Sequence, residues 1–105
     1  VPYNIQIKQE KYYQTILHLI FRMLGFDCRS EVQLAAGRID TLVETKDNVF
    51  CFEFKLNETA ESALQQIDTK EYLLPWTGSG KKLFKIGVSF DYEKRNINEW
   101  KVKSG

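Results

Sequence analysis

Apolar residues recur along this 105-residue chain with two different periods, and the periods divide it into elements. A helical period of three to four residues runs from Lys8 to Leu24, with Gly25 as a candidate C-cap. A second helical stretch runs from Thr59 to Leu74, before Pro75 and a glycine-rich run. The apolar stripe of the first helix is wide, which predicts heavy packing on a sheet. Its members are Tyr12, Tyr13, Ile16, Leu17, Leu19, Ile20, Met23 and Leu24.

Between the two helices the period falls to two, which indicates strands. Three strands are predicted, at Cys28–Ala35, Arg38–Thr45 and Val49–Lys55. The turns between them are short, so the three strands form an antiparallel meander.

Two more strands are predicted after the second helix. Lys82–Phe90 is followed by a charged loop at Asp91–Asn96 and by an edge strand at Ile97–Val102 that carries Trp100. The second helix is long enough to be a crossover, so the fourth strand should run parallel to its neighbour. The predicted fold is therefore α/β: helix, three strands, helix, strand, strand, with a mixed sheet flanked by helices.

Length and composition predict one globular domain over residues 1–105. With 43% hydrophobic and 28% charged residues, the chain is not of the disordered class. No apolar run approaches the roughly 20 residues of a membrane-spanning helix. The chain begins at Val1 with neither a signal peptide nor an initiator methionine, which suggests a piece of a longer protein. Cys28 and Cys51 lack metal-ligand spacing and are predicted to be buried free thiols in a reducing cytoplasm.

Charge is unevenly distributed, although the net charge is only +1. Residues 39–80 carry three basic against eight acidic side chains, and residues 81–105 carry seven against three. The basic C-terminal third could meet a polyanion, but an ordinary solvated surface explains it equally well.

Asp40, Glu53 and Lys55 are the strongest candidates for chemistry. Side chains two apart on a strand share a face, so Glu53 and Lys55 project together. On the strand before, Asp40 shares its face with the apolar Leu42. Two carboxylates on adjacent strands suit magnesium, and the Phe54 carbonyl could add a third oxygen. Lys55 could orient or deprotonate a water, or stabilise charge on a phosphate.

Each candidate also has a simpler explanation. Glu53 and Lys55 could form a salt bridge without any metal. Glu10 is expected in the first turn of its helix, where the helix dipole favours an acid. His18, the only histidine, lies between two leucines and is expected to be a packing or surface residue.

Taken together, the motifs resemble the PD-(D/E)xK nuclease superfamily, and more closely the nuclease-like domain at the C-terminus of bacterial AAA-type ATPase proteins. The resemblance covers nearly the whole chain. It rests on Glu10-Lys11-Tyr12-Tyr13-Gln14, Gly37-Arg38-Ile39-Asp40, Phe52-Glu53-Phe54-Lys55, Ala63-Leu64-Gln65-Gln66-Ile67, Lys85-Ile86-Gly87-Val88, Lys94-Arg95-Asn96-Ile97 and Trp100.

The resemblance implies a restriction-endonuclease-like core with Asp40 and Glu53 as Mg²⁺ ligands, Mn²⁺ being possible, and Lys55 as the catalytic lysine. It matches Glu10 to an assisting acid of the first helix. Gln66, or Gln65 if the register shifts by one, matches a polar residue of the second helix. Ile39 occupies the place of the superfamily's motif proline, which is often absent.

Two functions follow from this resemblance. One is a metal-dependent nuclease that hydrolyses nucleic acid, DNA being expected, while attached to an AAA-type ATPase domain in the full-length chain. The alternative is a catalytically inactive nuclease-fold module that binds nucleic acid or regulates that ATPase.

Overall fold

The computed structural model of the chain describes residues 3–91, 93 and 96–105. Two α-helices, one short 3-10 helix and five strands make up this part. They are α1 Tyr3–Met23, β1 Asp27–Leu34, β2 Gly37–Glu44, β3 Asn48–Leu56, α2 Ala60–Thr69, η1 Leu74–Trp76, β4 Lys82–Asp91 and β5 Asn96–Ser104.

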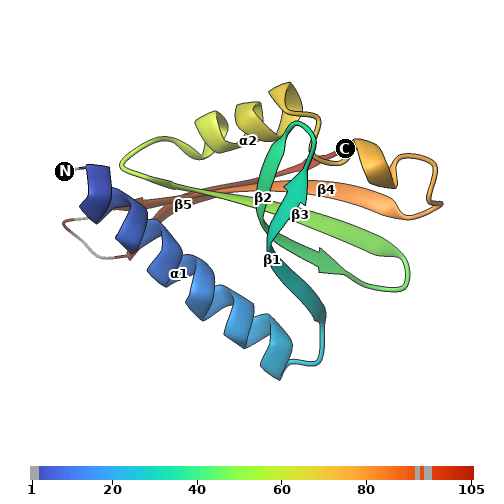
Figure 1. Cartoon of the computed structure of the whole chain (residues 1–105), viewed down its shortest axis with the longest axis horizontal. Coiled ribbons are helices and arrows are strands. Elements are labelled where there is room, and N and C mark those ends of the chain that lie inside the picture. Colours follow the sequence, from blue (N-terminus) through green and yellow to red (C-terminus); the bar gives the residue numbers. More distant parts are fainter. Residues whose placement is uncertain (1–2, 92, 94–95) are drawn as a thin grey trace.

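The strands form one mixed sheet in the order β1-β2-β3-β4-β5, with β3 and β4 parallel and every other pair antiparallel. The two helices cover opposite faces (Figure 1). Cys51 of β3 packs with Ile67 of α2 in one apolar cluster, and Phe54 packs with Leu17 of α1 in the other. The meander, the parallel fourth strand and the α/β class are therefore confirmed.

Helix α1 begins five residues earlier than its periodicity predicts. Its end is as expected, since Gly25 adopts a left-handed φ of 87° and the Phe26 N–H bonds the Phe21 carbonyl over 3.0 Å. Because the helix starts at Tyr3, Glu10 does not lie in its first turn. The dipole explanation of Glu10 is therefore wrong, since that effect falls off within one turn.

The heavy packing expected of α1 is only partly present. Tyr13 and Leu17 contact the sheet, but a second line of apolar side chains faces outward. Helix α1 packs on strands β1, β2 and β3 with one side, and no other described helix lies over its outer side (Figure 1). The exposed apolar residues are Tyr12, Ile16, Leu19, Ile20, Met23 and Leu24.

Helix α2 ends at Thr69, so the prediction that it continues to Leu74 is wrong. Glu71 has a left-handed φ of 50°, and the Tyr72 N–H bonds the Ile67 carbonyl over 3.2 Å, which together close a Schellman turn. The turn carries Tyr72 into the core, where it is 2% exposed, and leaves Leu74 exposed in η1.

Glycine at position 87 sets the distance between α2 and β4. A Cβ atom at Gly87 would lie 2.3 Å from the carbonyl oxygen of Ala60, too close for any larger residue. Ala60 and Ala63 are fully buried at this contact. The small residues therefore hold the N-terminal half of α2 tightly on the sheet, which determines where its later side chains lie.

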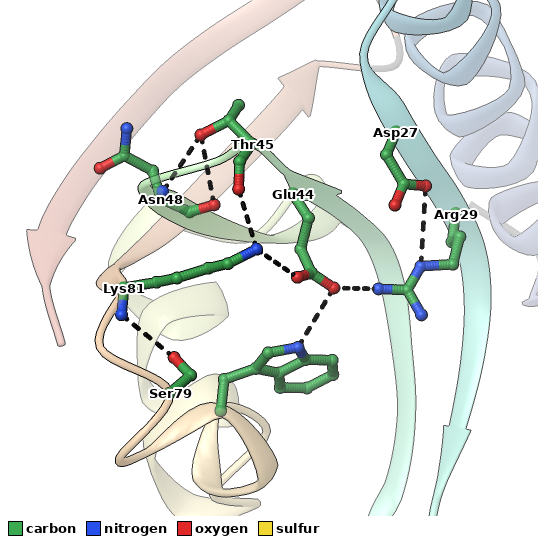
Figure 2. A network of polar contacts seen from close by, with 8 residues as sticks. Asp27, Arg29, Glu44, Thr45, Asn48, Ser79 and Lys81 are labelled. Atoms are coloured by element: carbon green, nitrogen blue, oxygen red, sulfur yellow. Dashed lines mark hydrogen bonds and ion pairs between the residues drawn. The ribbon is translucent and has the colours of Figure 1, made fainter.

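Glu44, at the end of β2, anchors the segment between α2 and β4 (Figure 2). Its carboxylate accepts hydrogen bonds from the Trp76 indole over 3.2 Å, from Lys81 Nζ over 2.9 Å and from Arg29 of β1. Lys81 also bonds the Thr45 carbonyl. The Glu44 carboxylate thus connects β2 with β1 and with the segment between α2 and β4.

The C-terminal part agrees with expectation where it is described. β4 extends through Asp91 and β5 begins at Asn96, so residues 92, 94 and 95 of the predicted loop lie outside the described part. β5 is an edge strand, on which Trp100 is 67% exposed. Both cysteines are buried and free. No described helix is apolar over enough of its length to span a bilayer, α1 with its 21 residues included.

Candidate active site

Asp40 lies where the strand pairing is interrupted on both sides. Between β1 and β2, Ser30 pairs with Thr41 and Val32 with Ile39, but Glu31 and Asp40 between them do not pair. The pairing of β2 with β3 ends at Thr41 and Phe52. The Phe54 N–H donates a hydrogen bond to Asp40 Oδ2 over 2.9 Å. The carboxylate is therefore held at the point where the strands separate.

Glu53 and Lys55 both turn toward α2, and Gln66 lies between them. Lys55 Nζ donates to Gln66 Oε1 over 2.6 Å, and Gln66 Nε2 donates to Glu53 Oε2 over 3.0 Å. Because an ammonium group can only donate, the Gln66 amide has a single consistent orientation. No ion pair of the described residues joins Glu53 directly to Lys55.

These side chains open into a cleft of about 360 Å³. All the residues that the sequence singled out for the site reach it, together with four that it did not. The predicted residues are Glu10, Asp40, Glu53, Phe54, Lys55 and Gln66. The additional ones are Lys11, Gln14, Glu31 and Arg38. Gln65 is exposed and does not line the cleft, so Gln66 is the second-helix residue of the site.

Comparison with protein families gives one match of wide extent. The model described as the PD-(D/E)XK nuclease superfamily matches residues 8–100, which is most of the chain and includes every residue of the cleft. This chain belongs to the PD-(D/E)XK nuclease superfamily. Comparisons with curated proteins and with solved structures found no significant match.

The PD-(D/E)XK cleft makes its carboxyl groups unusually weak acids. Burial, and then the Asp40 carboxylate, raise the pKa of Glu53 to about 9. Burial likewise raises the pKa of Asp40, against the lowering effect of the Phe54 N–H. Glu10 has its pKa raised to about 7, first by burial and then by Asp40. Neighbouring acids in a partly dry site repel one another, so they favour either a proton or a cation between them.

The donor set of this PD-(D/E)XK chain fits a hard divalent cation. Glu53 Oε1 is buried, and no hydrogen-bond donor of the described residues reaches it. Asp40 lies beside it, and Phe54 also lines the cleft, so its carbonyl would be the third oxygen of such a site. Among the described residues, no group of three or more Asp, Glu, His or Cys side chains is placed to hold a metal, so a cation here would take at most two carboxylates from the protein. Such a set suits Mg²⁺, which keeps several waters. PD-(D/E)XK nucleases typically use divalent metals.

Two of the four unpredicted residues of the cleft have recognisable signals in the sequence. Gln14 follows Glu10 by four residues, which places both on one helix face, and it is only 8% exposed. Arg38 precedes Asp40 by two residues on β2. Glu31 has no such signal, because its left-handed φ of 53° within a strand depends on tertiary context.

His18 lies outside this cleft. Its Nδ1 is 2.7 Å from Ser30 Oγ and 3.6 Å from the Cys28 sulfur. These contacts agree with the expected packing role, although the side chain also borders a second pocket.

Proposed function

We propose that this chain is an active nuclease that hydrolyses phosphodiester bonds of nucleic acid, DNA first, with a divalent metal ion. The observation that carries the proposal is the paired, buried arrangement of Asp40 and Glu53, with Glu53 Oε1 lacking any donor among the described residues. Two carboxyl groups this close and this buried cannot both be ionised unless a cation lies between them. A site that binds a cation in its working state accounts for this arrangement.

Asp40, Glu53 and the Phe54 carbonyl would hold Mg²⁺, or Mn²⁺ in its place. When bound, the ion supplies charge neutralisation for a phosphate oxygen and lowers the pKa of a bound water. The chain's own contribution is to keep the two carboxyl groups side by side. Asp40 is held by the Phe54 N–H, and Glu53 by Gln66.

Lys55 would orient the attacking water or stabilise negative charge on the phosphate. Its ammonium group is held by Gln66 Oε1, two residues beyond Glu53 on the same strand. A positively charged group fixed before the reaction stabilises a developing charge without rearrangement. Glu10, across the cleft on α1, would assist as a further acid, because its raised pKa of about 7 allows it to exchange a proton near neutrality.

We also propose that this domain works as the C-terminal part of a longer bacterial, cytoplasmic protein with an AAA-type ATPase. The proposal rests on the pattern of motifs. A net charge of +1 offers little general attraction for nucleic acid, so a tethered partner could supply substrate engagement. The alternative function, an inactive binding or regulatory module, gives no reason to keep two carboxyl groups and a lysine in one polar cleft.

The test is incubation of the domain with plasmid, linear duplex and single-stranded DNA in the presence of Mg²⁺ or Mn²⁺. Cleavage by the wild type, and loss of it in Asp40→Asn and Lys55→Ala, is the expected result. Asp40→Asn is preferred to alanine because its amide oxygen can still accept the Phe54 N–H. Glu61→Gln, on the exposed side of α2, is the matched control and should cleave normally.

Metal binding provides a second readout that does not depend on cleavage. Mg²⁺ should raise the thermal midpoint of the wild type at pH 8 but not that of Asp40→Asn. A wild type that neither cleaves nor responds to metal would contradict the proposal and favour the binding module.

A further inference from the structure

A second pocket adjoins the cleft. It has a volume of about 320 Å³ and lies between α1 and β1. Thr15, His18 and Leu19 of α1 line it from one side, and Ser30 of β1 from the other. Lys11, Gln14 and Glu31 line both the pocket and the cleft, so the two are direct neighbours along α1.

The pocket combines polar groups with one apolar wall. The His18 ring is held by its 2.7 Å contact with Ser30 Oγ, and the Leu19 side chain is 54% exposed beside it. Thr15 adds a second hydroxyl. A planar ring, an apolar surface and two hydroxyls are groups that can contact a nucleobase and its sugar.

Lys11 lies at the junction of pocket and cleft. Its ammonium group is 3.4 Å from Glu31 Oε1, and both side chains are substantially exposed, so the ion pair is weak. A phosphate could therefore replace Glu31 as the partner of Lys11. Glu31 itself has a left-handed φ of 53°, a conformation that is uncommon in residues other than glycine and often occurs near functional sites.

We infer that this pocket binds a single unpaired nucleotide next to the scissile phosphate. The inference rests on the proposed nuclease function and specifies its substrate as single-stranded or locally unpaired nucleic acid. The volume is within the range of pockets that enclose small ligands, about 300–1,000 Å³. Bases within a duplex are stacked and offer only their edges, so a nucleoside enters such a pocket only after leaving the stack.

The test measures binding of a fluorescent single-stranded oligonucleotide, and of the same sequence as a duplex, by anisotropy. Lys55→Ala is the background, so that cleavage does not interfere. Leu19→Glu puts a negative charge into the pocket and should raise the Kd for the single strand about tenfold, in line with the loss of one base contact. His18→Gln should weaken binding in the same direction.

Leu74→Glu is the matched control, because Leu74 is also exposed, at 61%, and lies in η1, where it lines neither the pocket nor the cleft. A thermal melt of each variant verifies folding. Equal effects of Leu19→Glu and Leu74→Glu, or no binding of the single strand at all, would overturn the inference. So would an equal loss of duplex and single-strand binding in Leu19→Glu.

Cleavage assays separate this inference from the proposed function. If the wild type cleaves single-stranded DNA and Leu19→Glu leaves KM unchanged, the nuclease stands and the pocket fails. If the wild type cleaves nothing, yet single-strand binding depends on Leu19 and His18, the pocket stands and the nuclease fails.

Discussion

Gln66 Nε2 donates a hydrogen bond to the buried hydroxyl of Tyr72 over 3.3 Å. Tyr72 is 2% exposed and lies just beyond the turn that ends α2. The Gln66 amide also bonds Glu53 and Lys55. Tyr72 therefore helps to fix the amide that positions these two side chains. Gly37 leaves room for this hydroxyl, since a Cβ atom there would lie 3.1 Å from it.

Tyr72→Phe should therefore reduce kcat of the proposed reaction about three- to tenfold, with little change in KM. This corresponds to the loss of one neutral hydrogen bond, about 0.5–1.5 kcal/mol. Steady-state kinetics with wild type and variant provide the measurement. Tyr12→Phe is the control, because Tyr12 is 60% exposed on α1. An unchanged kcat in Tyr72→Phe would show that Gln66 needs no such support.

Thr41→Val should stabilise the domain, by up to about 1 kcal/mol. Thr41 is fully buried, and its Oγ1 has no hydrogen-bond partner among the described residues, so a methyl group of the same shape removes an unsatisfied polar atom. The free energy of unfolding from urea titration measures the effect. Thr45→Val should do the opposite, because Thr45 Oγ1 accepts from the Asn48 N–H. A loss of stability in Thr41→Val would contradict this account.

In a chelator, the domain should become less stable as pH rises from about 5 to 9. The folded pKa values of Glu53, about 9, and Glu10, about 7, lie above the ordinary 4.5. A raised folded pKa contributes stability that is complete below the unfolded value and is lost as pH rises through the folded one. Thermal melts at several pH values measure the slope.

Glu53→Gln should flatten this pH dependence and raise the thermal midpoint at pH 8. The neutral amide can still accept from Gln66 and can donate toward Asp40, without introducing a second charge. Added Mg²⁺ should stabilise the wild type at pH 8 and leave Glu53→Gln unchanged. An equally steep pH dependence of stability in the variant would show that a group other than Glu53 causes it.

Glu44→Gln should destabilise the domain at pH 7 by about 1–2 kcal/mol, because the carboxylate accepts from Arg29, Lys81 and Trp76. Hydrogen bonding to Lys81 is the largest cause that lowers the pKa of Glu44. A lowered folded pKa gives stability that is present above the unfolded value near 4.5 and lost as pH falls through the folded one.

The difference between wild type and Glu44→Gln should therefore shrink once the pH is well below about 4. Urea titrations at pH 7 and pH 3 measure it. Asp47→Asn, in the adjacent turn, serves as a control of equal charge change. A difference that persists undiminished at pH 3 would attribute the effect to packing instead of charge.

Periodicity was sufficient for the order and type of the two α-helices and the five strands, but not for the short helix η1. Strand alternation and short turns determine the meander, and a helical crossover determines the parallel fourth strand, because both follow from local geometry. The strand period also put Glu53 and Lys55 on one face, and the Gln66 side chain did turn out to lie between them.

Only the tertiary structure decided where α1 begins, where α2 ends and which distant side chains meet. Helix α2 ends at a left-handed residue, Glu71, and not at a glycine that could have been recognised in the sequence. The interrupted pairing at Asp40 depends on the strands on both sides of it. The exposed stripe of α1 and the support of Gln66 by Tyr72 likewise depend on which surfaces the folded chain covers. The local pattern of apolar and polar residues predicts which face of an element a side chain lies on. Which residues from distant parts of the sequence it contacts is determined by the packing of the elements.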